Sequence, residues 1–220
     1  MNNNIRSALQ DSEKIILFKK IKEDELILKL KKYYFENDNS SLNLSGIIYE
    51  LIELSIKEGL SGDLWHNYLK IKLAAAENIF TLKAEKNLIN KKSSLYQIAL
   101  NDVKIINMLF SYSFQDIIQP LNHNGLKNLK DFKITESELN AYNSKRYHKL
   151  FNDRTAQTNL DNLIKFYQNH GAGILNQSRA FYWQQNNLKT VNNPDSISFN
   201  QLISYQKEKN RLIENTESFL

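Results

Sequence analysis

Apolar residues recur along most of this chain at spacings of three and four, which place side chains on one face of a helix. The first such segment predicts one long helix from Ser12 to about Asn37. A second helix is expected to begin near Ser45 and to end at Gly59, because glycine is the usual residue just past a helix end. The polar segment 37–41 separates the two predicted helices.

The middle of the chain predicts three further helices. Ser61 is the expected N-cap of the first, with Asp63 in the first turn, where a negative charge suits the helix dipole. Ser93 or Ser94 caps the second, which carries a strong apolar periodicity. The third is expected over residues 136–151 and is less apolar than its neighbours.

Toward the C-terminal end the elements become shorter. A helix is expected over residues 159–170, with Gly171 closing it in a left-handed cap, and a short helix over 174–183. Residues 188–191 have the character of a short strand. The sequence Asn-Asn-Pro at 192–194 indicates a linker, since the residue before a proline is driven away from helical conformation.

The last segment is predicted to be a separate helix that begins at Ser198, with Gln201 completing a capping box. Together these patterns predict an all-α fold. We expect a multi-helix N-terminal domain at residues 1–192, then a Pro-containing linker and a terminal helix at 193–220. The terminal segment carries apolar residues that need a cover, and we expect its helix to be labile or to pack on the body or on a second chain: Phe199, Leu202, Ile203, Leu212, Ile213 and Phe219.

Composition supports a soluble, helical class. The chain has 41% hydrophobic and 24% charged residues, and its six glycines and two prolines are few for a turn-rich fold. It has no cysteine, so it has neither a disulfide framework nor a thiolate zinc site. The start resembles no signal peptide and the apolar runs are short, so we expect a cytoplasmic protein that does not enter a membrane.

Sequence motifs argue against catalysis by this chain alone. A P-loop needs Gly-x-x-x-x-Gly-Lys-Ser/Thr, and no glycine here is followed by lysine. The pair Gly171 and Gly173 begins like a dinucleotide loop but has no third glycine, so a helix cap is the favoured interpretation. The four histidines are scattered without metal-ligand spacing. We therefore expect no catalytic residue, no metal and no cofactor in this chain.

One basic and aromatic cluster predicts nucleic-acid contact as an alternative function. It consists of Lys145, Arg146, Tyr147 and Lys149, and the net charge of +5 permits such a partner. The cations would contact phosphates while Tyr147 stacks on a base. The other interpretation is an ordinary charged helix face with one anchoring tyrosine, and no recognised nucleic-acid motif is present.

A second aromatic run, Phe181-Tyr182-Trp183, follows Arg179. Aromatic residues and arginine are frequent in protein-binding hot spots, so this run is a candidate partner-binding patch. Such a run more often belongs to a core at the end of a helix, and that is the interpretation we favour.

Several segments resemble, in order, the N-terminal region of the bacterial AAA+ ATPase family known as domain of unknown function 815. The resemblance covers roughly residues 59–220 and rests on Gly59-Leu60-Ser61-Gly62-Asp63-Leu64-Trp65, Glu77-Asn78-Ile79-Phe80, Phe166-Tyr167 with Gly171-Ala172-Gly173, Arg179-Ala180-Phe181, and the end segment from Asn193. Ile79 stands where the family has proline, and Ser204 where it has glycine.

The resemblance implies an ATPase core beyond Leu220, which would bind ATP and Mg²⁺ in a full-length parent. It places residues 202–206 beside the adenine ring, so Ile203 and Tyr205 are the candidate nucleotide contacts. This chain would then be the non-catalytic region that recognises a protein partner or substrate, or controls assembly. Oligomers would form through the ATPase module of the parent.

Overall fold

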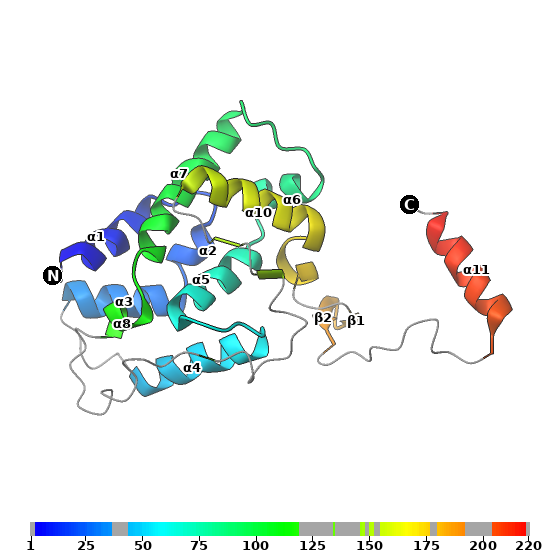
Figure 1. The fold of residues 1–220 in the computed structure, drawn as a ribbon, viewed down its shortest axis with the longest axis horizontal. Coiled ribbons are helices and arrows are strands. Elements are labelled where there is room, and N and C mark those ends of the chain that lie inside the picture. Colours follow the sequence, from blue (N-terminus) through cyan, green and yellow to red (C-terminus); the bar gives the residue numbers. More distant parts are fainter. Residues whose placement is uncertain are drawn as a thin grey trace. The chain divides into compact units, whose positions relative to one another are not determined.

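The computed structural model describes residues 3–36, 44–118, 134, 146–147, 150–151, 155–176, 180–191 and 204–218. These residues are predominantly helical, which confirms the all-α class, and they include one two-stranded antiparallel sheet (Figure 1). The chain divides into two compact units, Met1–Gln177 and Ser178–Leu220. We predicted a boundary after residue 192, whereas the hairpin at 181–190 belongs to the second unit.

The first unit is a body of helices. Its described elements are, in chain order, α1 (Asn3–Asp11), η1 (Ser12–Lys14), α2 (Lys19–Lys22), α3 (Glu25–Glu36), α4 (Leu44–Lys57), α5 (Leu64–Ala74), α6 (Ile79–Glu85), α7 (Ser94–Phe110), α8 (Phe114–Ile118), α10 (Ala156–His170) and η5 (Gly173–Asn176). The second unit has β1 (Phe181–Gln184), β2 (Asn187–Thr190) and α11 (Gln206–Glu217).

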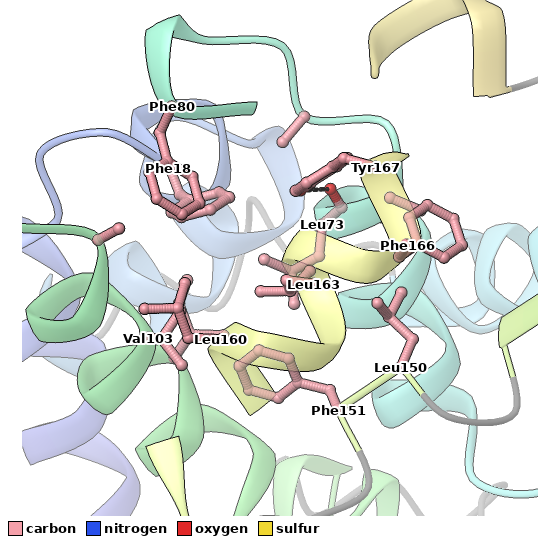
Figure 2. Close-up of a cluster of buried hydrophobic side chains, with 14 of the residues drawn as sticks. Phe18, Leu73, Phe80, Val103, Leu150, Phe151, Leu160, Leu163, Phe166 and Tyr167 are labelled. Carbon is pink, nitrogen blue, oxygen red and sulfur yellow. Dashed lines mark hydrogen bonds between the residues drawn. The ribbon is translucent and has the colours of Figure 1, made fainter. Parts of the chain in front are cut away.

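The body buries two clusters of apolar side chains. One is formed by α6, α7, α10 and the segment around Phe18, and the other by α1, α3, α4 and α8. Helix α5 contributes to both, because it is buried on nearly every side. In the first cluster the side chains of α10 face Leu73 of α5, and the Tyr167 hydroxyl donates to the Leu73 carbonyl at 2.6 Å (Figure 2).

The single long helix predicted from Ser12 to Asn37 is wrong. The chain leaves helical conformation at Ile15 and resumes it in α2 and α3. Three successive backbone amides, those of Ile16, Leu17 and Phe18, donate to the buried Asp102 carboxylate of α7 at 2.6–3.2 Å. The amides bind a side chain from a distant helix instead of carbonyls four residues earlier, so the helix is interrupted.

A second carboxylate positions the start of α3. Asp24 accepts a hydrogen bond from the Leu26 amide, another from the Tyr68 hydroxyl of α5, and pairs with Lys72 at 2.7 Å. Burial, together with the charge of Asp24, raises the pKa of Tyr68 well above its ordinary value, so this hydroxyl remains a donor.

The sequence predicted Ser61 as the N-cap of α5, but in the structure the N-cap is Asp63. The Asp63 carboxylate accepts from the His66 amide at 3.0 Å, and its second oxygen accepts from the Phe114 amide of α8 at 2.8 Å. One side chain therefore caps α5 and joins it to α8.

Local end signals predicted other elements correctly. Gly59 has φ of +66° just past α4, Ser93 caps α7 by accepting from the Tyr96 amide, and Gly171 ends α10 with φ of +76°. The ψ of Gly171 is 175°, which differs from the ψ of the left-handed helical cap that the sequence predicted. The strand predicted at 188–191 is confirmed as β2.

The helices predicted at 174–183 and 136–151 have different outcomes. The single helix predicted at 174–183 is wrong, because Gly173–Asn176 form the short 3-10 helix η5 and Phe181 begins the strand β1. Most of the helix predicted at 136–151 lies outside the described residues. Its last residue, Phe151, has φ of +57°, which ends helical geometry there.

We predict that Asp102→Asn destabilises the protein by about 2–4 kcal/mol. Asparagine keeps one oxygen but places an amide donor against backbone amides, which leaves buried donors without an acceptor. Urea unfolding followed by circular dichroism measures the change. Asp11→Asn, which removes only a surface pair with Lys14, is the matched control and should cost less than about 1 kcal/mol. Equal effects of the two substitutions would contradict the role assigned to Asp102.

Candidate interaction site

The hairpin of the second unit is built around a two-residue turn. Gln185 and Asn186 have φ of +49° and +58°, the pair of positive values found in type I′ turns, and asparagine tolerates that conformation well. The strands pair antiparallel, and the Val191 amide donates to the Ala180 carbonyl at 2.8 Å, which extends the ladder past the named strands.

The register gives this hairpin one apolar face. Phe181 lies opposite Thr190 and Trp183 lies opposite Leu188, so these four side chains share a face. The other face carries Tyr182 and polar residues. Trp183 is 69% exposed, so the favoured interpretation of the aromatic run as core is wrong and the alternative, a patch available to a partner, gains support.

Helix α11 is equally uncovered. The structure places no buried residue on it, and both Leu212 and Ile213 are exposed. It begins at Gln206 and not at Ser198, because Ser204 and Tyr205 have φ of +69° and +63° and no side chain caps the helix. Ser198, Gln201, Phe199, Leu202 and Phe219 lie outside the described residues.

Of the two candidate adenine contacts, the structure describes one. Tyr205 is 70% exposed and stands at the N-cap of α11, directly after Ser204. Its ring is therefore accessible to a ligand. Ile203 lies outside the described residues.

The basic cluster is anchored within the body. The Arg146 guanidinium pairs with Glu58 at 2.9 Å and lies over the ring of Tyr147, whose hydroxyl donates to the same carboxylate. Tyr147 is buried, and burial together with the nearby charge of Glu58 raises the pKa of its hydroxyl. A buried ring has no free face for a base, so the stacking role proposed for Tyr147 is wrong.

The same arrangement affects His170 at the end of α10. Its ring lies 4.9 Å from that of Phe166, and burial together with the charge of Arg146 lowers the pKa of the imidazole. His170 is therefore neutral near pH 7 and adds no positive charge to the cluster. Lys145, Lys149 and Arg179 lie outside the described residues, so nucleic-acid binding through them stays a prediction.

The loop after α10 faces carboxylates. The Ala172 amide donates to Glu85 at 3.3 Å, and a Cβ added at Gly173 would lie 1.9 Å from an oxygen of Glu77. Gly173 thus allows the Glu77 side chain to approach the backbone. Two carboxylates at this position would repel a phosphate, which agrees with the interpretation of Gly171 and Gly173 as a helix end and not as a nucleotide loop.

One groove of the body lies among residues that the structure describes. A groove between α1 and α3, lined by Leu9, Gln10, Glu13, Lys31 and Phe35, holds about 260 Å³, which is smaller than usual ligand pockets. An ion pair between Glu13 and Lys31 crosses it, and the hydrogen bond from Lys31 lowers the pKa of Glu13. Among the described residues no group of three or more His, Cys, Asp or Glu is arranged to hold a metal.

Among the helices that the structure describes, none has both the length and the hydrophobicity needed to cross a bilayer. The apolar hairpin face, which the sequence interpretation missed, was marked by alternation at residues 181, 183, 188 and 190 around a turn containing asparagine.

No family model, no curated protein and no solved structure matches this chain.

We predict that Trp183 emits as a solvated indole, because it is exposed, whereas Trp65 is buried and donates to the Leu109 carbonyl at 2.9 Å. Trp183→Phe should remove the red-shifted part of the emission and most of the quenching by iodide. The remaining emission, from Trp65, should be blue-shifted and protected from iodide. A protein whose two tryptophans are equally protected before the substitution would show that the hairpin face is covered.

Proposed function

We propose that this chain is the non-catalytic N-terminal region of a cytoplasmic AAA+ ATPase, and that its helical body recognises a protein partner or substrate. Hydrolysis of ATP would belong to a module outside this sequence, and oligomers would form through that module. The observation that carries the proposal is α11, a helix of 12 residues that buries none of them in this chain.

The low stability expected of an isolated helix supports the proposal that another module packs on α11. A helix of this length is marginal in water by itself, and helices in proteins gain most of their stability from packing an apolar face. Leu212 and Ile213 are exposed here. In the proposed parent, the ATPase module would pack on them and stabilise the helix.

The backbone supports the family resemblance at both departures from its pattern. Ser204, where the family has glycine, has φ of +69°, a conformation that glycine adopts without strain. Ile79, where the family has proline, is the first residue of α6 after the N-cap Asn78, a position at which proline is common. Each position therefore suits the residue type that the family resemblance leads us to expect.

The polar side chains of the body support binding rather than reaction. Asp24, Asp63 and Asp102 accept backbone or hydroxyl hydrogen bonds that hold helices together, and Glu58 anchors Arg146 and Tyr147. These carboxylates are occupied by structural roles. A region of this kind would present surfaces to a partner while the ATPase module performs the chemistry.

We expect hydrogen exchange to separate the two states of α11. In the 220-residue chain, the amides of residues 206–217 should exchange fast, because the helix has no buried residue. In the product of the whole gene they should become protected, while α5 is protected in both. Strong protection of α11 in the monomeric chain, or a gene that ends at the codon for Leu220, would refute the ATPase proposal.

Tyr205 provides a test of nucleotide contact. Stacking of a base on an aromatic ring contributes about 1–3 kcal/mol, so Tyr205→Ala in the whole gene product should raise the Kd for ATP about tenfold. Titration with a fluorescent ATP analogue measures it. Tyr182→Ala, at another exposed tyrosine of the same unit, is the matched control and should leave the Kd unchanged. Equal Kd values for both variants would remove Tyr205 from the site.

A further inference from the structure

The outer face of α6 carries an exposed stripe of aliphatic and basic side chains. Ile79, Leu82, Lys83 and Lys86 follow the spacing of one helix face, and Leu88 extends the row just past the helix end. Ile79, Leu82 and Leu88 are 59%, 43% and 63% exposed. We call these five residues the α6 stripe.

Both ends of α6 are held by complete caps, so the α6 stripe is rigid. At the start, Asn78 accepts from the Phe80 and Thr81 amides, and the Thr81 hydroxyl accepts from the Asn78 amide. At the end, Asn87 adopts φ of +56°, and the Leu88 amide donates to the Lys83 carbonyl at 2.8 Å. This is a Schellman motif, which fixes Leu88 beside the last turn.

In a Schellman motif the residue in the position of Leu88 frequently makes an apolar contact with the helix residue five or six positions earlier. Here those residues are Lys83 and Leu82, and Leu88 nevertheless remains 63% exposed. The cap therefore holds an aliphatic side chain in solvent instead of covering it. Such a side chain is pre-organised for an intermolecular contact, because its backbone loses little freedom on binding.

The opposite face of α6 fixes the stripe to the body. Phe80, Thr81 and Ala84 are buried, and the helix packs on α7 and α10 (Figure 1). The acidic residues of this segment, Glu77 and Glu85, contact the loop at 171–173. Lys83 and Lys86 make no ion pair with any residue that the structure describes, so the α6 stripe has a positive charge.

Two occupants of this surface are disfavoured by its own composition. A second copy docked symmetrically would bring Lys83 and Lys86 against the same lysines, and like charges repel. An anionic membrane surface usually requires clusters of roughly four to eight basic residues, whereas the α6 stripe has two and no aromatic anchor.

We propose that the α6 stripe docks an acidic amphipathic helix of another protein. The aliphatic side chains would pack between those of the incoming helix in ridge-and-groove fashion, and its carboxylates would pair with Lys83 and Lys86. This site goes beyond the proposed function, because α6 belongs to the helical body and the inference does not depend on an ATPase module.

The test uses the 220-residue chain and a labelled helical peptide of about 15 residues, with leucines at i, i+3, i+4 and i+7 and glutamates beside them. We expect saturable binding by fluorescence anisotropy and NMR shift changes centred on residues 79–88. Leu82→Glu should weaken binding by about tenfold or more. It replaces an aliphatic contact of the proposed complex with a negative charge, which the glutamates of the peptide would repel. Leu28→Glu, at an α3 leucine with the same 43% exposure, is the matched control and should leave binding unchanged.

A charge exchange makes the test independent of folding defects. Lys83→Glu with Lys86→Glu should abolish binding of the acidic peptide and create binding of the peptide whose glutamates are replaced by lysines. The inference is overturned if the wild-type chain does not bind the acidic peptide, or if Leu82→Glu and Leu28→Glu bind equally well. It is also overturned if the α6 stripe instead mediates self-association in sedimentation experiments, or binding to phosphatidylserine vesicles that Leu82→Glu abolishes.

Discussion

The helical body depends on one buried carboxylate, that of Asp102. It is inaccessible to solvent, and the amides of Ile16, Leu17 and Phe18 converge on it from a segment more than eighty residues away in the sequence. A buried charge is costly unless it is fully hydrogen-bonded, and these amides supply the bonds. Because these amides bind Asp102, they do not donate to backbone carbonyls of a continuous helix. The chain therefore turns between η1 and α2 and places Phe18 against Phe80. The interruption of the first helix and the entry of Phe18 into the first apolar cluster therefore have one cause.

Other carboxylates repeat this principle at the boundaries between helices. Asp63 joins the start of α5 to the start of α8, and Asp24 joins the start of α3 to Tyr68 and Lys72. Short helices that cannot stabilise themselves are in this way capped by side chains that also link them. The outcome is a body in which Asp24, Asp63 and Asp102 link helices to one another. Its free chemistry lies on outward faces such as the α6 stripe, where lysines and aliphatic side chains meet solvent.

The second unit follows a different rule. Its hairpin and α11 are locally well formed, with a type I′ turn at Gln185 and Asn186, yet Trp183, Leu212 and Ile213 are exposed. An isolated two-stranded hairpin is marginally stable in water, so an element of this kind ordinarily has a cover. The sequence interpretation assigned Phe181–Trp183 to a core, because composition alone does not reveal whether another part of the chain packs on these side chains. It also extended the terminal helix back to Ser198, because the positive φ of Ser204 and Tyr205 has no signature in either residue type.

The sequence by itself determined the all-α class and those element ends that rest on local chemistry. Gly59 after α4, Ser93 before α7 and Gly171 after α10 act within a few residues, where backbone conformation and capping are decided. Tertiary structure alone decided the break at residues 15–18, the link that Asp63 makes to α8, and the burial of Tyr147 against Glu58. Each of these depends on a partner from another helix, and its energy is available only after the chain has folded. The exposure of Trp183 and of the α6 stripe belongs to the same category, since a side chain is exposed or buried according to what the rest of the chain places beside it.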